Sequence, residues 1–198
     1  MQKQRKADIR RTTKETEVRL ELNLDGTGQA DISSGIGFLD HMMTLLAVHS
    51  RMDILLRASG DLEVDEHHCV EDIAICLGHC LHEALGDKVG INRYGEATIP
   101  MDESLVRVVL DLSGRNCLCY HLAVPAERVG VLGRESVEEF FTAFCRQAGI
   151  NMHVDQLRGS NSHHLVEATF KALARALRQA IQIDPSIDGV WSSKGRLD

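Results

Sequence analysis

Apolar and polar residues alternate along several short stretches of the chain, whereas in other stretches the apolar residues recur every three or four positions. Strict alternation is typical of strands with one buried face, and the longer spacing is typical of helices with an apolar stripe. The glycines between Gly26 and Gly37 form no dinucleotide-binding fingerprint, because no strand-helix-strand unit surrounds them. The alternating stretches predict two strands within residues 5–25, and further strands at residues 52–58, 94–99, 105–112, 117–124 and 151–157.

Four stretches have the spacing of amphipathic helices, and capping residues indicate where they begin and end. The first begins near Phe38, the second runs from Glu66, after the N-cap Asp65, to Gly86, the third covers residues 136–148, and the fourth begins at Asn161 or Ser162. Their apolar stripes include Leu39, Met42, Met43, Leu46 and Ala47 in the first helix, Val70, Ile73, Leu77 and Leu81 in the second, and Val166, Phe170, Leu173 and Leu177 in the fourth.

The sequence His-His-x-x-Glu occurs twice, at residues 67–71 and 163–167, and each copy begins a predicted helix. On a helix the first histidine and the glutamate of this motif share a face, whereas the second histidine is rotated by about 100°. Imidazole and carboxylate groups are suitable ligands for divalent transition metals such as Zn, Fe or Mn. Each motif therefore predicts a two-ligand face for one metal ion and a histidine directed at a second ion.

A shift of 96 residues aligns the two motifs and the apolar stripes of the helices that follow them. The elements before each motif also recur in the same order, as strands, helix and strand. We therefore expect an α+β two-layer fold with internally duplicated lobes, each a β-sheet covered by helices on one face. The first lobe should cover about residues 1–88 and the second about residues 89–198, packed together as one compact unit.

The repeat also gives His41 a counterpart, although a single histidine at such a position is usually a core or surface residue. His41 lies 26 residues before His67, and the equivalent place in the second lobe, allowing a turn two residues shorter, is Glu139. Because neighbouring histidines diverge, we expect some ligands of each metal to come from other subunits of an oligomer. One pseudo-symmetric arrangement places His41, His68, His163 and Glu167 on one metal ion, and Glu139, His164, His67 and Glu71 on the other.

Composition and charge narrow the possible functions. Of the 198 residues 43% are hydrophobic, which is ordinary for a globular protein with a sizeable core. The net charge is −7, and no Lys/Arg run is present to neutralise several phosphates, so we expect no nucleic-acid partner. No apolar run is long enough to span a bilayer and none follows the basic N-terminus, which predicts a cytoplasmic protein. The six cysteines contain no CxxC pair and are expected to be free, mostly buried thiols.

The motif residues resemble those of the imidazoleglycerol-phosphate dehydratases of histidine biosynthesis. The resemblance extends from about residue 5 to residue 195 and is carried by residues 38–42 (FLDHM), 65–72 (DEHHCVED), 100–103 (PMDE), 161–172 (NSHHLVEATFKA) and 192–195 (SSKG). It implies a ribosomal protein S5 domain 2-like duplicated fold and two Mn²⁺ ions per active site. It also implies a shell of 24 identical subunits, with active sites formed between subunits.

The resemblance further implies a small-molecule phosphate substrate, D-erythro-imidazoleglycerol phosphate, which loses water to give imidazole acetol phosphate. The metal ions would act on the imidazole ring as Lewis acids and as a template. A carboxylate base would take a proton from the carbon next to the one that loses its hydroxyl. By resemblance Glu15 is this base, and Glu167 is assigned a catalytic as well as a metal-binding role. The implied substrate contacts are His41, His49, His67 and Glu71, and those to the phosphate are Arg93, Arg115, Ser192 and Lys194.

The chain departs from the family at Glu139, where many members have histidine in the pattern VEHFF. A carboxylate can replace imidazole as a Mn ligand, but Glu138 or His153 could instead complete the second site. Two other functions compete with the dehydratase. A di-metal phosphatase or hydrolase would usually have Asp-rich clusters, whereas imidazole dominates these motifs. A noncatalytic metal-binding shell protein of the ferritin kind would need four long helices, and the predicted strands argue against it.

Overall fold

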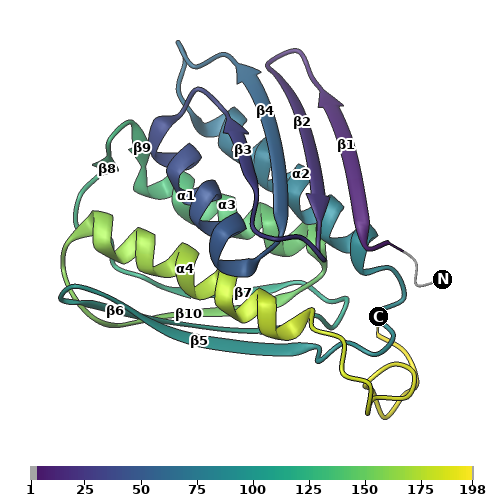
Figure 1. The fold of residues 1–198 in the computed structure, drawn as a ribbon. Helices are drawn as coiled ribbons and strands as arrows, with labels where there is room; N and C mark the ends of the chain where they lie inside the picture. The colour runs from purple at the N-terminus through teal and green to yellow at the C-terminus, as the bar shows by residue number, and fades with distance from the viewer. Residues whose placement is uncertain (1–3, 198) are drawn as a thin grey trace.

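The computed structural model describes residues 4–197, which form two four-stranded sheets, each with two helices on one face (Figure 1). In the first lobe the strand order is β1-β2-β4-β3, and only β3 and β4 are parallel. The alternation of β2 places Val18 and Leu20 on the buried face of this sheet. The elements of this lobe are β1 (Lys6–Thr12), β2 (Thr16–Asn23), β3 (Ala30–Ser33), α1 (Gly37–Ser50), β4 (Asp53–Gly60) and α2 (His67–Leu85).

The second lobe repeats the first in strand order and direction. Its sheet has the order β5-β6-β10-β7, with β7 and β10 as the parallel pair. The duplicated α+β fold is therefore confirmed, and the expected lobe boundary falls in the loop between α2 and β5. The elements of this lobe are β5 (Tyr94–Met101), β6 (Ser104–Asp111), β7 (Cys117–His121), the short hairpin β8 (Arg128–Val129) and β9 (Leu132–Gly133), α3 (Arg134–Ala148), β10 (Asn151–Arg158) and α4 (Ser162–Ala180).

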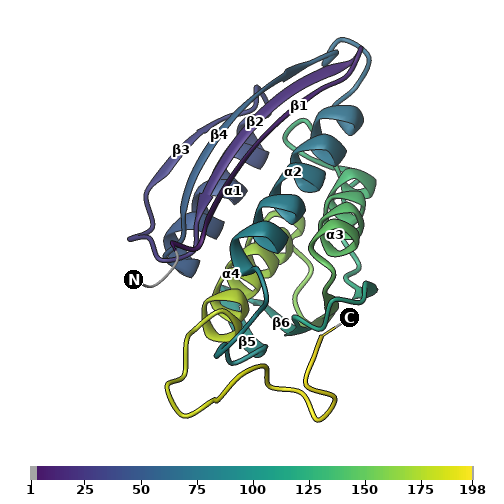
Figure 2. The same ribbon diagram turned by 90° about the vertical axis from the view of Figure 1, so that its right-hand side faces the viewer.

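The two lobes meet through their helices, so that the sheets form the outer layers (Figure 2). Helix α1 packs against α4, and α2 packs against α3. Gly78 permits the second of these contacts, since a Cβ atom there would lie 2.7 Å from Cβ of Gln147. Phe140 and Phe170, from α3 and α4, pack with ring centroids 5.2 Å apart in the shared core. The helices that carry the two motifs are thereby held by both lobes.

Some predictions from the sequence need correction. Residues 30–33 form strand β3, and residues 128–133 contain the β8–β9 hairpin; neither was predicted. The N-cap residue of α2 is Glu66 and not Asp65, but the Asp65 carboxylate accepts a hydrogen bond from the backbone N–H of His67 at 2.9 Å.

All six cysteines are free, and four are buried, as expected. Burial raises the pKa of the Cys76 thiol to about 11. Over the part of the chain that the structure describes, no helix is long and apolar enough to cross a membrane.

Candidate active site

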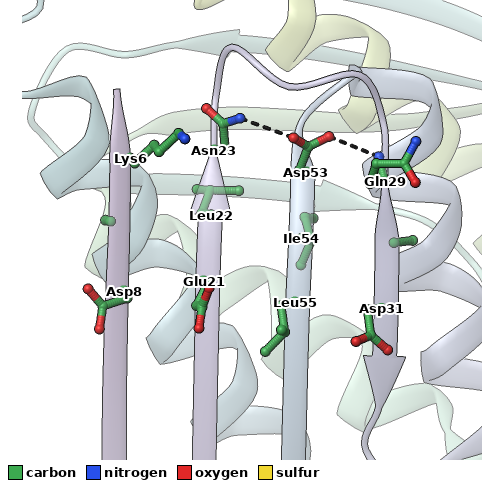
Figure 3. Close-up of a pocket in the computed structure, with 12 residues that line it drawn as sticks. Lys6, Asp8, Glu21, Leu22, Asn23, Gln29, Asp31, Asp53, Ile54 and Leu55 are labelled. Atoms are coloured by element: carbon green, nitrogen blue, oxygen red, sulfur yellow. Dashed lines mark hydrogen bonds between the residues drawn. The ribbon is translucent and has the colours of Figure 1, made fainter. Parts of the chain in front are cut away.

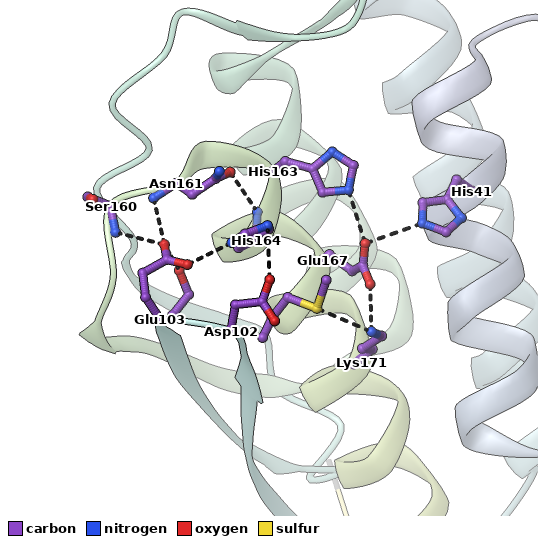
Figure 4. A network of polar contacts seen from close by, with 11 residues as sticks. His41, Asp102, Glu103, Ser160, Asn161, His163, His164, Glu167 and Lys171 are labelled. Carbon is purple, nitrogen blue, oxygen red and sulfur yellow. Dashed lines mark hydrogen bonds and ion pairs between the residues drawn. The ribbon is translucent and has the colours of Figure 1, made fainter.

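A cluster of two histidines and one glutamate lies where α1 packs against α4 (Figure 4). The Nε2 atoms of His41 and His163 lie 3.3 and 3.1 Å from Oε2 of Glu167. One ligand atom from each of the three residues falls within 4.8 Å of the others, and no second such group exists within residues 4–197. Two imidazoles and a carboxylate gathered in this way form a donor set suited to a divalent transition metal.

Glu167 contacts both histidines of this cluster, and its side chain is only 8% exposed. Its second oxygen accepts a hydrogen bond from Lys171 Nζ at 2.5 Å. Burial tends to raise the pKa of Glu167, but the hydrogen bonds from Lys171 and His41 outweigh it and lower the pKa below its ordinary value. Glu167 is thus an anion at neutral pH. Lys171 was not among the predicted site residues, although its position four residues after Glu167 is the spacing of a helical ion pair.

The second histidine of each motif is turned away from this cluster and contacts a carboxylate through Nδ1. His68 Nδ1 lies 3.0 Å from Asp61, and His164 Nδ1 lies 2.7 Å from Glu103 (Figure 4). The hydrogen bond with Asp61 raises the pKa of His68. Glu15 is near His68 as well, with its carboxylate 3.9 Å from Nδ1. Asp61 and Glu103 were not among the predicted site residues, because nothing in their sequence spacing indicates these contacts.

The other predicted metal ligands lie apart within the single chain. His67 and Glu71 begin α2, and Glu71 accepts a hydrogen bond from Arg146 of α3 at 3.3 Å. Glu139 is half-buried on α3, which packs against α2 as α1 packs against α4. Its neighbour Glu138 is exposed. His153 projects from the outer face of its sheet, since the adjacent residues of β10 point into the core. The complete four-ligand sets are therefore not gathered within one subunit.

A cationic pocket brings together the four residues predicted to bind phosphate. Arg93, Arg115, Ser192 and Lys194 line a cavity of about 270 Å³, which Arg196 also borders. Arg93 donates to both oxygens of Asp111, at 2.7 and 3.0 Å, and to the carbonyl of Trp191 at 2.9 Å. This connects the start of β5 to the C-terminal tail, and so places the tail residues of the pocket beside those of the sheet.

His49, the remaining predicted substrate contact, lies two turns after His41 on α1. It is half-buried beside α4. Burial lowers its pKa, and the nearby charges of Lys171 and Arg175 lower it further. His49 therefore lies on the side of α1 that faces α4, as His41 does.

The cluster and the cationic pocket lie at opposite ends of α4. His163 is in the first turn of this helix, whereas the backbone N–H of Arg93 bonds the carbonyl of Ala180, the last residue of the helix. A helix of 19 residues is about 28 Å long at about 1.5 Å per residue. Within one chain the two groups are therefore too far apart to contact one small molecule.

A cavity of about 690 Å³ lies on the outer face of the first sheet and contains none of the predicted site residues (Figure 3). Asp53 is at one end of it, where its carboxylate accepts hydrogen bonds from Asn23 at 3.0 Å and from the backbone N–H of Gln29 at 3.0 Å. Partial burial tends to raise the pKa of Asp53, but these bonds outweigh it and lower the pKa. Asp53 thus secures the turn between β2 and β3. The residues that line the cavity include carboxylates but no histidine.

The fold and the site define an internally duplicated α+β protein with a histidine–carboxylate cluster where its lobes meet. A family model described as imidazoleglycerol-phosphate dehydratase matches residues 34–177. The chain is 57% identical over 194 residues to the imidazoleglycerol-phosphate dehydratases of Syntrophomonas wolfei and Heliobacterium modesticaldum. These alignments cover 98% of this chain, and 98% and 100% of the two relatives. The chain therefore belongs to the imidazoleglycerol-phosphate dehydratase family, and it is a hydro-lyase.

Two solved structures confirm the fold. The imidazoleglycerol-phosphate dehydratase of Staphylococcus aureus superposes with a TM-score of 0.83 at 40% identity, over 90% of this chain and 99% of that one. The enzyme of Pyrococcus furiosus, solved in complex with (S)-C348, superposes with a TM-score of 0.80 at 36% identity, over 96% and 100%. The resemblance noted from the motifs thus extends over nearly the whole chain.

Proposed function

We propose that this enzyme dehydrates D-erythro-imidazoleglycerol phosphate to imidazole acetol phosphate in histidine biosynthesis, with two Mn²⁺ ions in each active site. The observation that carries the proposal is the convergence of His41 and His163 on the ionised Glu167. Imidazole and carboxylate donors in this arrangement suit a divalent metal that holds an imidazole ring. A family name that describes the same substrate supports it.

The reaction needs a base that is free to move a proton. In the proposed step the Glu15 carboxylate removes the proton from the carbon next to the hydroxyl-bearing carbon attached to the ring. The electron pair of that C–H bond forms a C=C bond, and the hydroxyl on the carbon beside the ring leaves as water after taking a proton from solvent. The resulting enol then takes a proton on the carbon beside the ring and becomes the ketone. Glu15 suits this role because its side chain is 56% exposed and its carboxylate lies beside a motif histidine, His68.

The residues of the two motifs fit the proposed metals. His41, His163 and Glu167 would hold one ion, and their counterparts His67, Glu71 and Glu139 the other. His68 and His164 would complete the two sets from neighbouring subunits. Glu139 is preferred to His153 as a ligand. Glu139 lies on α3, which packs against the motif helix α2, whereas His153 is on the outer face of its sheet. When bound, the metals would supply Lewis acidity to the substrate ring.

The cationic pocket would bind the substrate phosphate. Guanidinium groups suit a phosphate because they donate two parallel hydrogen bonds. Arg93 is held by Asp111, so its position is fixed before any ligand binds. Arg115 and Lys194 would add charge, and the Ser192 hydroxyl would donate a further bond.

The separation of about 28 Å between cluster and pocket supports an active site shared between subunits, since the substrate is far shorter than α4. We therefore propose a homo-oligomer in which the cluster of one subunit faces the cationic pocket of another. The family resemblance implies assembly into 24 subunits, and the sequence indicates a cytoplasmic location; both stay predictions.

The test is turnover of imidazoleglycerol phosphate by the protein loaded with Mn²⁺. The proposal predicts a ketone product and no free phosphate. Release of phosphate would instead indicate the di-metal hydrolase. If neither product forms with any divalent metal although metal is bound, the protein is a noncatalytic metal-binding one.

A further inference from the structure

The second histidines of the two motifs are held in the same way by residues from different places in the two lobes. Each presents Nδ1 to a carboxylate, which is Asp61 for His68 at 3.0 Å and Glu103 for His164 at 2.7 Å. Of the two neutral tautomers of an imidazole, a carboxylate at Nδ1 favours the one with its proton on that atom, and in this tautomer the Nε2 lone pair can act as a ligand. Both histidines are thus oriented before any metal binds.

The lobes differ in which segment supplies that carboxylate. Glu103 lies in the turn between β5 and β6, and the equivalent turn of the first lobe, between β1 and β2, carries Glu15. Glu103 bonds its histidine, whereas Glu15 stays 3.9 Å from His68. In the first lobe the bond is made from the loop between β4 and α2. This loop covers residues 61–66, whereas the corresponding loop of the second lobe covers only residues 159–161.

The two turn glutamates are accordingly in different states. Glu103 also accepts hydrogen bonds from the backbone N–H of Asn161 at 3.0 Å and from the Ser104 hydroxyl at 2.9 Å, so it is fixed at the start of α4. Glu15 makes no comparable side-chain bond among the described residues, and more than half of its side chain is exposed. A carboxylate held by three donors is a poor base, whereas a free one can approach a substrate.

We propose that Asp61 and Glu103 are positioning residues, which fix the Nδ1–H form of His68 and His164. From its place in the hairpin turn, Glu15 would be expected to make the bond with His68. Because Asp61 makes this bond instead, Glu15 stays available as the base. The longer loop of the first lobe thus converts one of two equivalent turn glutamates from a structural group into a reactive one. This inference deepens the proposed function, and the part that concerns metal binding rests on that function.

Asp61→Asn is the principal test, because the Asp61 carboxylate has no hydrogen-bond partner besides His68 among the described residues. In the metal-free variant, ¹⁵N NMR of the His68 ring at alkaline pH should show a mixture of tautomers, whereas the wild type shows the Nδ1–H form. Affinity for Mn²⁺, measured against a competing chelator, should fall about 10-fold to 100-fold. Glu103→Gln should have the same effects at His164. Saturating Mn²⁺ should restore turnover in both variants.

Asp155→Asn is the matched control, since Asp155 lies 3.6 Å from His121 on the outer face of its sheet, away from both motifs. It should leave Mn²⁺ affinity and turnover unchanged. Glu15→Gln should also keep wild-type Mn²⁺ affinity, but no excess of Mn²⁺ should restore its turnover.

The proposal is overturned if folded Asp61→Asn keeps both the tautomer and the Mn²⁺ affinity of the wild type. If Glu103→Gln fails to fold, which its bonds to α4 make conceivable, Asp61→Asn alone decides. The tautomer measurement needs neither metal nor substrate. If the wild type does not turn over imidazoleglycerol phosphate but Asp61→Asn still changes the tautomer, then the proposed function fails and the positioning role stands.

Discussion

At the scale of single residues, the site combines groups that sequence spacing indicates with groups that only the fold brings near. The two motifs and the FLDHM segment identified His41, His163 and Glu167, which the structure gathers within 4.8 Å. Asp61 lies seven residues before His68, and Lys171 lies within helix α4, which does not need this side chain to form. The contact of Asp61 depends on the path of the loop before α2, which no single-sequence pattern specifies, whereas the spacing of Lys171 from Glu167 was a usable signal.

Glu15→Gln should reduce kcat by about 100-fold to 10,000-fold, the range usual for loss of a general base. The amide keeps the size of the side chain but cannot take a proton. Metal content and oligomer size should match those of the wild type, because the Glu15 side chain makes no hydrogen bond among the described residues that would support the fold. Steady-state kinetics with metal analysis would check this, and wild-type kcat in the variant would exclude Glu15 as the base.

Asp53→Asn should lower the free energy of unfolding by about 1–2 kcal/mol at neutral pH, since hydrogen bonds to a charged acceptor are replaced by weaker neutral ones. The folded-state pKa of Asp53 is lowered, so its contribution is present above the unfolded pKa of about 3.9 and is lost as pH falls through the folded value. The difference between variant and wild type should therefore shrink below about pH 4 in urea unfolding.

Asp31→Asn is the control for this measurement, because Asp31 is an exposed partner of Arg57 on the same sheet and such surface pairs contribute little. An Asp53→Asn difference that stays constant between neutral and acidic pH would contradict the argument.

At the scale of elements, hydrophobic periodicity predicted the four helices and most strands, because each buries one continuous face. It missed β3, which has only four residues at a sheet edge, and the two-residue strands β8 and β9. Such short edge segments bury too little apolar surface to leave a period in the sequence. The pairing of helices across the lobes was also not predictable, since it depends on close contacts such as the one at Gly78.

Gly78→Ala should destabilise the protein by about 1–3 kcal/mol, because the added methyl group would force α2 and α3 apart. Its Cβ would lie 2.8 Å from the carbonyl oxygen of Phe144 as well as close to Gln147. Gly37→Ala is the matched control in a helix, since no atom lies within 4 Å of its added Cβ. Thermal unfolding of the two variants tests this, and equal melting temperatures would show that α2 and α3 are not in tight contact.

At the scale of the whole molecule, the separation of cluster and pocket supports the proposed active site shared between neighbouring subunits. His163→Ala should inactivate the cluster of every subunit that carries this substitution. Lys194→Ala should weaken phosphate binding in the pocket of every subunit that carries it. In oligomers assembled from equal amounts of both variants, about one quarter of the shared sites should combine an intact cluster with an intact pocket. Activity of the mixture should exceed that of either variant alone. A mixture as inactive as its parents would contradict active sites shared between subunits.

In the proposed active site the two His-His-x-x-Glu motifs each contribute to both metal ions. Anomalous scattering at the Mn absorption edge, recorded from crystals of the Mn²⁺-loaded enzyme, tests this arrangement most directly. We expect two Mn peaks per active site, one contacted by His41, His163 and Glu167 and the other by His67, Glu71 and Glu139, with His68 and His164 completing them from other subunits. Peaks away from the motifs, or two complete ligand sets within a single chain, would contradict it.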